Sequence, residues 1–156
     1  MKDGGKKINI YAPAVGKVVS IKEVPDTVFS NSLIGEGFAV KPEGGIITSP
    51  VSGEVTVIPE TIHAIGITTD RGAEVLIHFS TNSVELEGKG LSTELKVGDR
   101  VEVGDIIIKY DDELIKDIIK DTITPVVVTN ISEFKYQINL DAKPGKPVMK
   151  LKKIER

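Results

Sequence analysis

Apolar residues along the chain fall mainly in short runs in which Val, Ile and Thr dominate. Gly, Pro, Asp or Asn, the residues that favour turns, close each run. β-Branched residues in runs of this length favour strands. The pattern therefore predicts an all-β fold, a sandwich or barrel of about eight or more short strands. The expected strands lie in GKVVSI (16–21), GFAVKP (37–42), GEVTVI (53–58), AIGITT (64–69), EVLIHF (74–79), RVEVGDIIIKY (100–110), TPVVVTN (124–130) and VMKLKKI (148–154).

One segment breaks the strand pattern. In DDELIKDIIKDT, residues 111–122, apolar residues recur at helical spacing behind two aspartates that can cap a first turn. We expect one short helix there.

Two segments share a spacing that indicates an internal repeat. APAVGKVVSI (12–21) and SPVSGEVTVI (49–58) both read Pro, Gly three residues on, Val two further, and then Ile. A recurring spacing of this kind predicts a duplicated β-motif. The stretch LKVGDRVEVGDIII (95–108) also repeats Val-Gly-Asp, which is typical of two tight turns.

Composition narrows the class of protein. A chain of 156 residues suits a single domain, 1–156, and the formal net charge of −3 disfavours a general binder of nucleic acid or of anionic membranes. The absence of cysteine leaves no thiolate nucleophile, so zinc would depend on histidine and carboxylate ligands. No apolar run is long enough for a membrane span, and MKDGGKK lacks the apolar middle of a signal peptide. We expect a cytoplasmic protein with no cofactor and no insertion into a membrane.

The two histidines, His63 and His78, lie in neighbouring predicted strands. If the hairpin loop is 69–72, Ile67 pairs with Glu74 and His63 lies opposite His78. Directly opposed residues have Cβ atoms about 4.5 to 5.5 Å apart, so both rings could touch one small group. Thr61, on the same face as His63 by strand alternation, could hold one ring by a hydrogen bond. A register slip of one residue would break this pairing.

Two readings of the histidines stay open at this point. A single histidine in a strand is more often a structural or exposed side chain, whereas two on one patch favour a site. Neutral imidazole is a nucleophile near pH 7, and a second ring can donate an N–H to phosphoryl oxygens. The pair therefore suits phosphoryl transfer. A zinc hydrolase ranks well behind, because no third ligand is evident.

Four stretches together resemble the glucose-type EIIA domain of the bacterial phosphoenolpyruvate-dependent sugar phosphotransferase system. The likeness covers about residues 10–131 in order. It implies a β-sandwich of the duplicated hybrid motif and a phosphocarrier that takes phosphate from HPr and passes it to a cysteine on the IIB domain of a sugar permease. The stretches are EVPDTVFSNSLIGEGFAVKP (23–42), TSPVSGEVTVIPETIHAIGITTDRGAEVLIHF (48–79), SVELEGKGLSTELKVGDRVEVGDIIIKYD (83–111) and DTITPVVVTN (121–130).

The resemblance also assigns roles to single residues. His78 matches the phosphorylated histidine, His63 the second histidine that steadies the phosphoryl group, and Thr61 the threonine that orients the second ring. The partner-binding face implied by the family is an apolar patch with acidic groups that meet arginine on HPr. Onto that face map Asp26, Phe29, Leu76 and Val84.

Two positions depart from the family pattern after the nucleophile. The family reads His-Ile/Phe-Gly-x-Asp-Thr-Val, whereas this chain reads HFSTNSV, with Ser80 for the glycine and Asn82 for the aspartate. The lost carboxylate removes a partner for an HPr arginine, and the added Cβ of Ser80 puts the geometry of His78 in question. The alternative is therefore an EIIA-like regulatory domain that binds target proteins with weak or no phosphotransfer. The tail after residue 131 predicts one or two closing strands with KPGKP as a turn.

Overall fold

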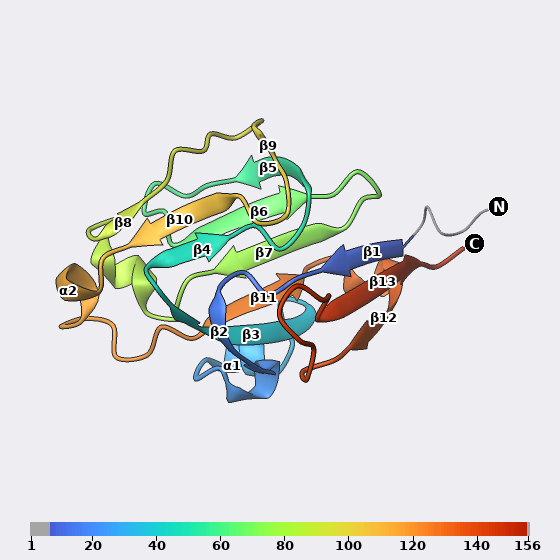
Figure 1. The fold of residues 1–156 in the computed structure, drawn as a ribbon, viewed down its shortest axis with the longest axis horizontal. Coiled ribbons are helices and arrows are strands. Elements are labelled where there is room, and N and C mark those ends of the chain that lie inside the picture. Colours follow the sequence, from blue (N-terminus) through green and yellow to red (C-terminus); the bar gives the residue numbers. More distant parts are fainter. Residues whose placement is uncertain (1–6, 156) are drawn as a thin grey trace.

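The computed structural model describes residues 7–155, and strands dominate it (Figure 1). Two single-turn helices are present, α1 (Thr27–Ser30) and α2 (Asp112–Ile115). The strands are β1 (Lys7–Ile10), β2 (Val15–Ser20), β3 (Glu36–Glu43), β4 (Ile46–Thr48), β5 (Gly53–Val57), β6 (Ala64–Thr68), β7 (Glu74–His78), β8 (Leu91–Ser92), β9 (Arg100–Val101), β10 (Ile106–Tyr110), β11 (Thr124–Val128), β12 (Phe134–Ile138) and β13 (Met149–Lys153).

The strands form three sheets. A seven-stranded sheet has the order β2-β3-β11-β7-β6-β5-β9, and two three-stranded sheets have the orders β4-β10-β8 and β1-β13-β12. Every described strand pair is antiparallel. The predicted all-β, sandwich-like fold is thus confirmed, and the tail forms β12 and β13 as the two closing strands.

The large sheet buries a different set of side chains on each face. From β6 and β7, Ile65, Ile67, Val75 and Ile77 enter the main core, which they share with Ile47 and Ile108 of the small sheet β4-β10-β8. A second cluster lies on the opposite face, where Phe29 of α1 packs with Ala39 and Val127. Both faces of the central strands are therefore apolar, and α1 covers the face that also carries Leu76 and His78.

The duplicated spacing marks two equivalent places in the large sheet. Gly16 lies in β2 and Gly53 in β5, and a Cβ at either position would come within 2.0 Å of the Lys41 carbonyl oxygen or 2.3 Å of the Thr68 carbonyl oxygen, respectively. Only glycine allows the neighbouring strand to approach so closely. The two units also exchange backbone hydrogen bonds, from Thr48 N–H to the Pro13 carbonyl and from Tyr11 N–H to the Pro50 carbonyl.

The predicted helix at 111–122 is much shorter in the structure. Asp111 caps α2 by accepting from the Glu113 and Leu114 amides, as one of the two aspartates was expected to do. Ile115 and Ile119 are buried, but Leu114 and Ile118 stay 57% and 39% exposed, so the apolar stripe is too narrow to sustain three turns. Helix α1 was not predicted, because a single turn leaves no helical periodicity to detect.

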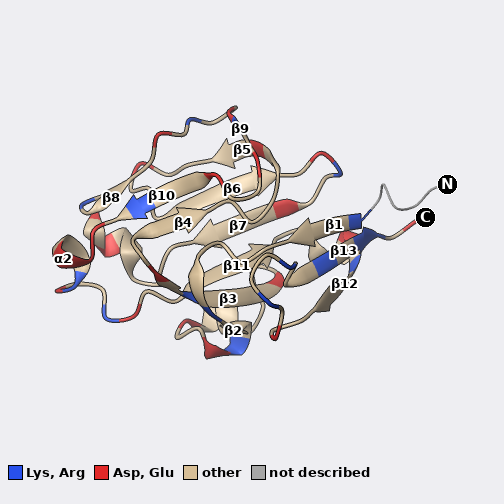
Figure 2. Ribbon diagram, in the orientation of Figure 1, with Lys and Arg blue, Asp and Glu red and all other residues tan. Residues whose placement is uncertain are grey.

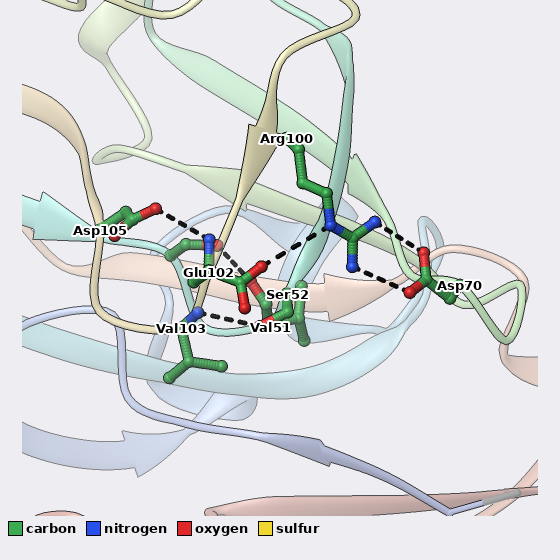
Figure 3. Close-up of polar contacts among 8 residues, drawn as sticks. Val51, Ser52, Asp70, Arg100, Glu102, Val103 and Asp105 are labelled. Carbon is green, nitrogen blue, oxygen red and sulfur yellow. Dashed lines mark hydrogen bonds and ion pairs between the residues drawn. The ribbon is translucent and has the colours of Figure 1, made fainter. Parts of the chain in front are cut away.

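An ion pair closes the edge of the large sheet (Figure 3). Arg100 of β9 donates from both terminal nitrogens to the two oxygens of Asp70, which lies in the β6–β7 hairpin loop, each at 2.8 Å. Its Nε also lies 3.7 Å from Glu102.

The two Val-Gly-Asp segments form the expected turns, with the Asp99 and Asp105 carboxylates accepting from the amides of Lys96 and Glu102.

Candidate functional site

Strand alternation brings His78 to the outer face of the large sheet. In β7, Val75 and Ile77 point into the core, so Leu76 and His78 point the other way, toward α1. Leu76 packs against the second apolar cluster and His78 is half-buried. The end of β7 thus presents one imidazole at the margin of an apolar surface.

The predicted register of the histidine hairpin is wrong by one residue. Thr68 pairs with Glu74 and Ala64 with His78, so His63 lies beyond β6 and not opposite His78. The loop is one residue longer than predicted, because the Thr69 amide bonds the Ala73 carbonyl at 2.9 Å and Ala73 is buried. Gly72, at φ +90°, provides the left-handed residue that such a loop needs.

A backbone kink directly precedes His63. Ile62 adopts φ +58°, a left-handed conformation that costs a β-branched residue about 1 to 3 kcal/mol. The His63 carbonyl accepts from the Phe79 amide at 2.8 Å, which continues the register of β6 and β7 by one residue. The ring centroids of His63 and His78 are 5.1 Å apart at 67°, so the two rings are neighbours, as predicted, in spite of the register error.

Each histidine has one ring nitrogen held by a neighbour. Nδ1 of His63 hydrogen-bonds the Thr61 hydroxyl, the bond expected from the sequence. Nδ1 of His78 lies 2.5 Å from the Ser80 carbonyl oxygen. A carbonyl oxygen can only accept, so Nδ1 of His78 carries the hydrogen and a neutral ring has its lone pair on Nε2. The structure therefore leaves Nε2 as the nucleophilic atom.

The surroundings favour the neutral form of both imidazoles. Burial lowers the pKa of His63 below its ordinary value. Burial also lowers the pKa of His78, with a smaller contribution from nearby His63, against the Ser80 carbonyl and Asp26, which act to raise it. Phe29 contributes to that burial, with its ring centroid 5.1 Å from that of His78. A neutral imidazole retains the lone pair that nucleophilic attack requires.

These shifts predict that the protein loses stability in mild acid. Above a pH of about 6.5 the histidines are neutral in both the folded and the unfolded chain. As the pH falls further, the unfolded chain binds protons first, because the folded pKa values are lowered, and unfolding becomes more favourable. We expect the urea midpoint to fall between pH 7.5 and pH 5.5. It should fall less in a double variant His63→Gln, His78→Gln; equal slopes in both proteins would contradict the assignment.

Ser80 adopts a left-handed backbone conformation, which favours glycine. Its φ is +55° and it is 1% exposed. The side-chain hydroxyl donates to the Asp121 carbonyl at 2.8 Å, and the Ser80 amide lies 3.4 Å from the Thr124 hydroxyl. The hydroxyl thus offsets the strain of a Cβ at positive φ, and the carbonyl of Ser80 still faces Nδ1 of His78.

Substitutions at Ser80 should separate strain from hydrogen bonding. Ser80→Gly loses the bond to Asp121 but also loses the strain, so we expect a change in unfolding free energy of no more than about 1 kcal/mol. Ser80→Ala loses the bond and keeps the strain, so we expect destabilisation by about 1 to 2 kcal/mol. Urea unfolding of the three proteins measures both. Equal loss in the two variants would mean that the conformation carries no strain.

The remaining predicted residues surround the histidines to different degrees. Asp26 caps α1 through a 2.9 Å bond from the Val28 amide and contributes electrostatically at His78. Asn82 is exposed and precedes a 3-10 turn, Ser83–Leu86, without bonding it through its side chain. Val84 in that turn is 51% exposed. Asp26 is therefore the one predicted carboxylate beside the ring pair.

Sequence reasoning missed the contacts that hold His78 from behind. Neither the Ser80 carbonyl nor the Asp121 and Thr124 partners of Ser80 was predicted. The one available signal was a polar residue where the family pattern has glycine.

Within residues 7–155, no three His, Cys, Asp or Glu side chains gather as metal ligands. No helix in that range is long and apolar enough to cross a membrane.

Both the sequence and the fold have relatives among known proteins. Residues 8–134 match the family model described as phosphoenolpyruvate-dependent sugar phosphotransferase system, EIIA 1. A glucose-specific EIIA component from Halalkalibacterium halodurans is 43% identical over 139 residues, which are 87% of this chain and 80% of that protein. A beta-glucoside-specific EIIBCA component from Bacillus subtilis is 46% identical over 134 residues, 86% of this chain but 22% of that longer protein. The solved glucose permease IIA from Mycoplasma capricolum superposes with a TM-score of 0.87, at 29% identity, over 96% of this chain and 99% of that one.

Proposed function

Because the chain belongs to the EIIA 1 family of the phosphoenolpyruvate-dependent sugar phosphotransferase system, whose members are phosphocarriers, we propose that His78 carries the phosphoryl group. Phospho-HPr is the donor and the IIB domain of a sugar permease is the acceptor. The whole chain acts as one EIIA domain in the cytoplasm.

The observation that carries this proposal is the hydrogen bond from Nδ1 of His78 to the Ser80 carbonyl. It directs the lone pair of a neutral imidazole to Nε2. That atom attacks phosphorus in line, a bond from Nε2 to phosphorus forms, and the bond to the HPr imidazole breaks. In the onward step the IIB thiolate attacks phosphorus and Nε2 leaves with its lone pair restored.

His63 is placed to stabilise the phosphoryl oxygens. The Thr61 hydroxyl can donate to Nδ1 of His63, which puts the ring hydrogen on Nε2. An N–H aimed at oxygens that gain charge during transfer lowers the barrier. Val84, which is 51% exposed, and the half-buried Leu76 supply apolar surface for docking. Phe29, predicted to lie on this surface, is 3% exposed and instead packs against His78 from within the core. Asp26 supplies a negative charge for a basic group on HPr.

The departures from the family pattern bear on the regulatory alternative. Ser80 still bonds His78 through its carbonyl, so this departure gives no support to loss of transfer. Asn82 removes a negative charge from an exposed position, where a charge contact contributes little. Phosphocarrier activity is thus the function that the geometry favours.

The test is intact-mass measurement after incubation with phosphoenolpyruvate, Enzyme I and HPr. We expect the mass of one phosphoryl group to be added, to be lost in acid, and to map to the peptide that contains His78. Omission of HPr is the control. If the folded protein gains no phosphoryl group under conditions that label a known EIIA, the phosphocarrier proposal fails. The regulatory domain is then the remaining alternative.

A further inference from the structure

Basic residues are concentrated in the C-terminal part of the chain, and Figure 2 shows Lys and Arg along β13. From residue 134 to the end, seven Lys and Arg residues stand against two Asp and Glu, a net charge of +5. Residues 1–133 have 13 basic and 21 acidic residues, a net charge of −8. The overall value of −3 therefore conceals a basic C-terminal region, which contains β12 and β13 of the sheet β1-β13-β12.

Strand register gathers lysines on one face of that sheet. Lys152 of β13 pairs with Lys7 of β1 and with Lys135 of β12, which gives a row of three lysines across the sheet. Two residues along, Lys150 pairs with Asn9 and Gln137. All six of these side chains are exposed, whereas Ile8, Ile10, Met149 and Leu151 on the other face are in the core. The exposed set of Lys7, Lys135, Lys150 and Lys152 is called the lysine face below.

The chemistry of the lysine face suits a diffuse anionic surface. Its six paired positions hold four lysines and two amides, with no carboxylate and no aromatic or aliphatic side chain. Protein interfaces depend on buried aromatic or arginine anchors, which this face does not have. Flexible ammonium groups instead attract lipid phosphates without fixed geometry, by about 1 kcal/mol for each lysine near an anionic bilayer.

The lysine face lies away from the histidines. Lys153, next to Lys152, brings its Nζ within 3.5 Å of the position of a Cβ on Gly72, in the loop that precedes β7. His78 is at the far end of β7, so about 13 Å of strand separates that loop from the site. A surface that contacts the lysine face would leave the ring pair open.

We propose that the lysine face docks the protein peripherally on anionic phospholipid, through the lipid phosphates and without insertion. The acidic remainder of the chain would be repelled from such a bilayer, so the same charge separation also orients the molecule. The proposal concerns binding alone and does not depend on phosphoryl transfer.

Vesicle sedimentation tests the proposal. We expect the protein to sediment at low salt with phosphatidylcholine vesicles that contain phosphatidylglycerol, and not with phosphatidylcholine alone. High salt should release it, because ions screen charge attraction. The triple variant Lys7→Gln, Lys135→Gln, Lys150→Gln should bind about two orders of magnitude more weakly. Lys152 is kept because it makes a further contact in the fold.

A matched variant separates the lysine face from net charge. Lys89→Gln, Lys96→Gln, Lys109→Gln changes the total charge equally at exposed positions outside the face, and we expect it to keep most of the binding. An equal loss in both variants would overturn the proposal. So would a failure to bind anionic vesicles at low salt, or capture by a polyglutamate peptide with none by vesicles, which would indicate an acidic protein partner.

Discussion

Replacing His78 by alanine is expected to abolish phosphoryl acceptance from phospho-HPr. The substitution removes the one ring nitrogen that the structure leaves both unprotonated and unbonded, because Nδ1 is engaged by the Ser80 carbonyl. His63 cannot replace it, since its Nδ1 is held by Thr61 and its ring hydrogen lies on Nε2 in the proposed arrangement. Intact-mass spectrometry after incubation with the donor system should show no added phosphoryl group.

Two observations keep this result interpretable. His63→Ala serves as the matched control, because it removes the same ring from the neighbouring position and should leave acceptance largely in place. In the wild type, nuclear magnetic resonance with nitrogen-labelled histidine should place the phosphoryl group on Nε2 of His78. A phosphoryl group on Nδ1 of His78 in the wild type, or on His63 in the His78→Ala variant, would contradict the assigned tautomers.

The sequence predicts much of this arrangement because strand signals are local. Val- and Ile-rich runs closed by turn residues place the strands, and two rare histidines in adjacent strands indicate the site. The hairpin register is not local in this sense. It depends on whether Thr69 pairs with Gly72 or with Ala73. This shift of one residue decides on which face of the sheet each side chain lies.

The remaining errors have the same origin in backbone conformation. Positive φ at Ile62 and Ser80 cannot be read from residue types that rarely adopt it. The rings of His63 and His78 are in contact in spite of the shifted register, and the kink at Ile62 lies directly before His63. The predicted contact of His63 and His78 is therefore present, although the predicted pairing is wrong.

Removing the helper ring should affect the onward step most strongly. His63→Ala is expected to slow transfer from phosphorylated His78 to a IIB domain by about 10²- to 10³-fold, the usual effect of deleting one preorganised donor to developing charge. Acceptance should change far less, because the nucleophile and its Ser80 contact are intact. Rapid-quench measurement of both half-reactions gives the two rates separately.

The Thr61 hydroxyl should act through the same ring. Thr61→Val conserves shape but removes the donor to Nδ1 of His63, so the ring can take the other tautomer and turn its lone pair toward the phosphoryl oxygens. We expect onward transfer to slow about tenfold, as for loss of one neutral hydrogen bond of about 1.4 kcal/mol. Thr61→Ser, which keeps the hydroxyl, should restore most of the rate. If Val and Ser slow transfer equally while the fold is intact, Thr61 acts by packing, and the orientation of His63 must come from elsewhere.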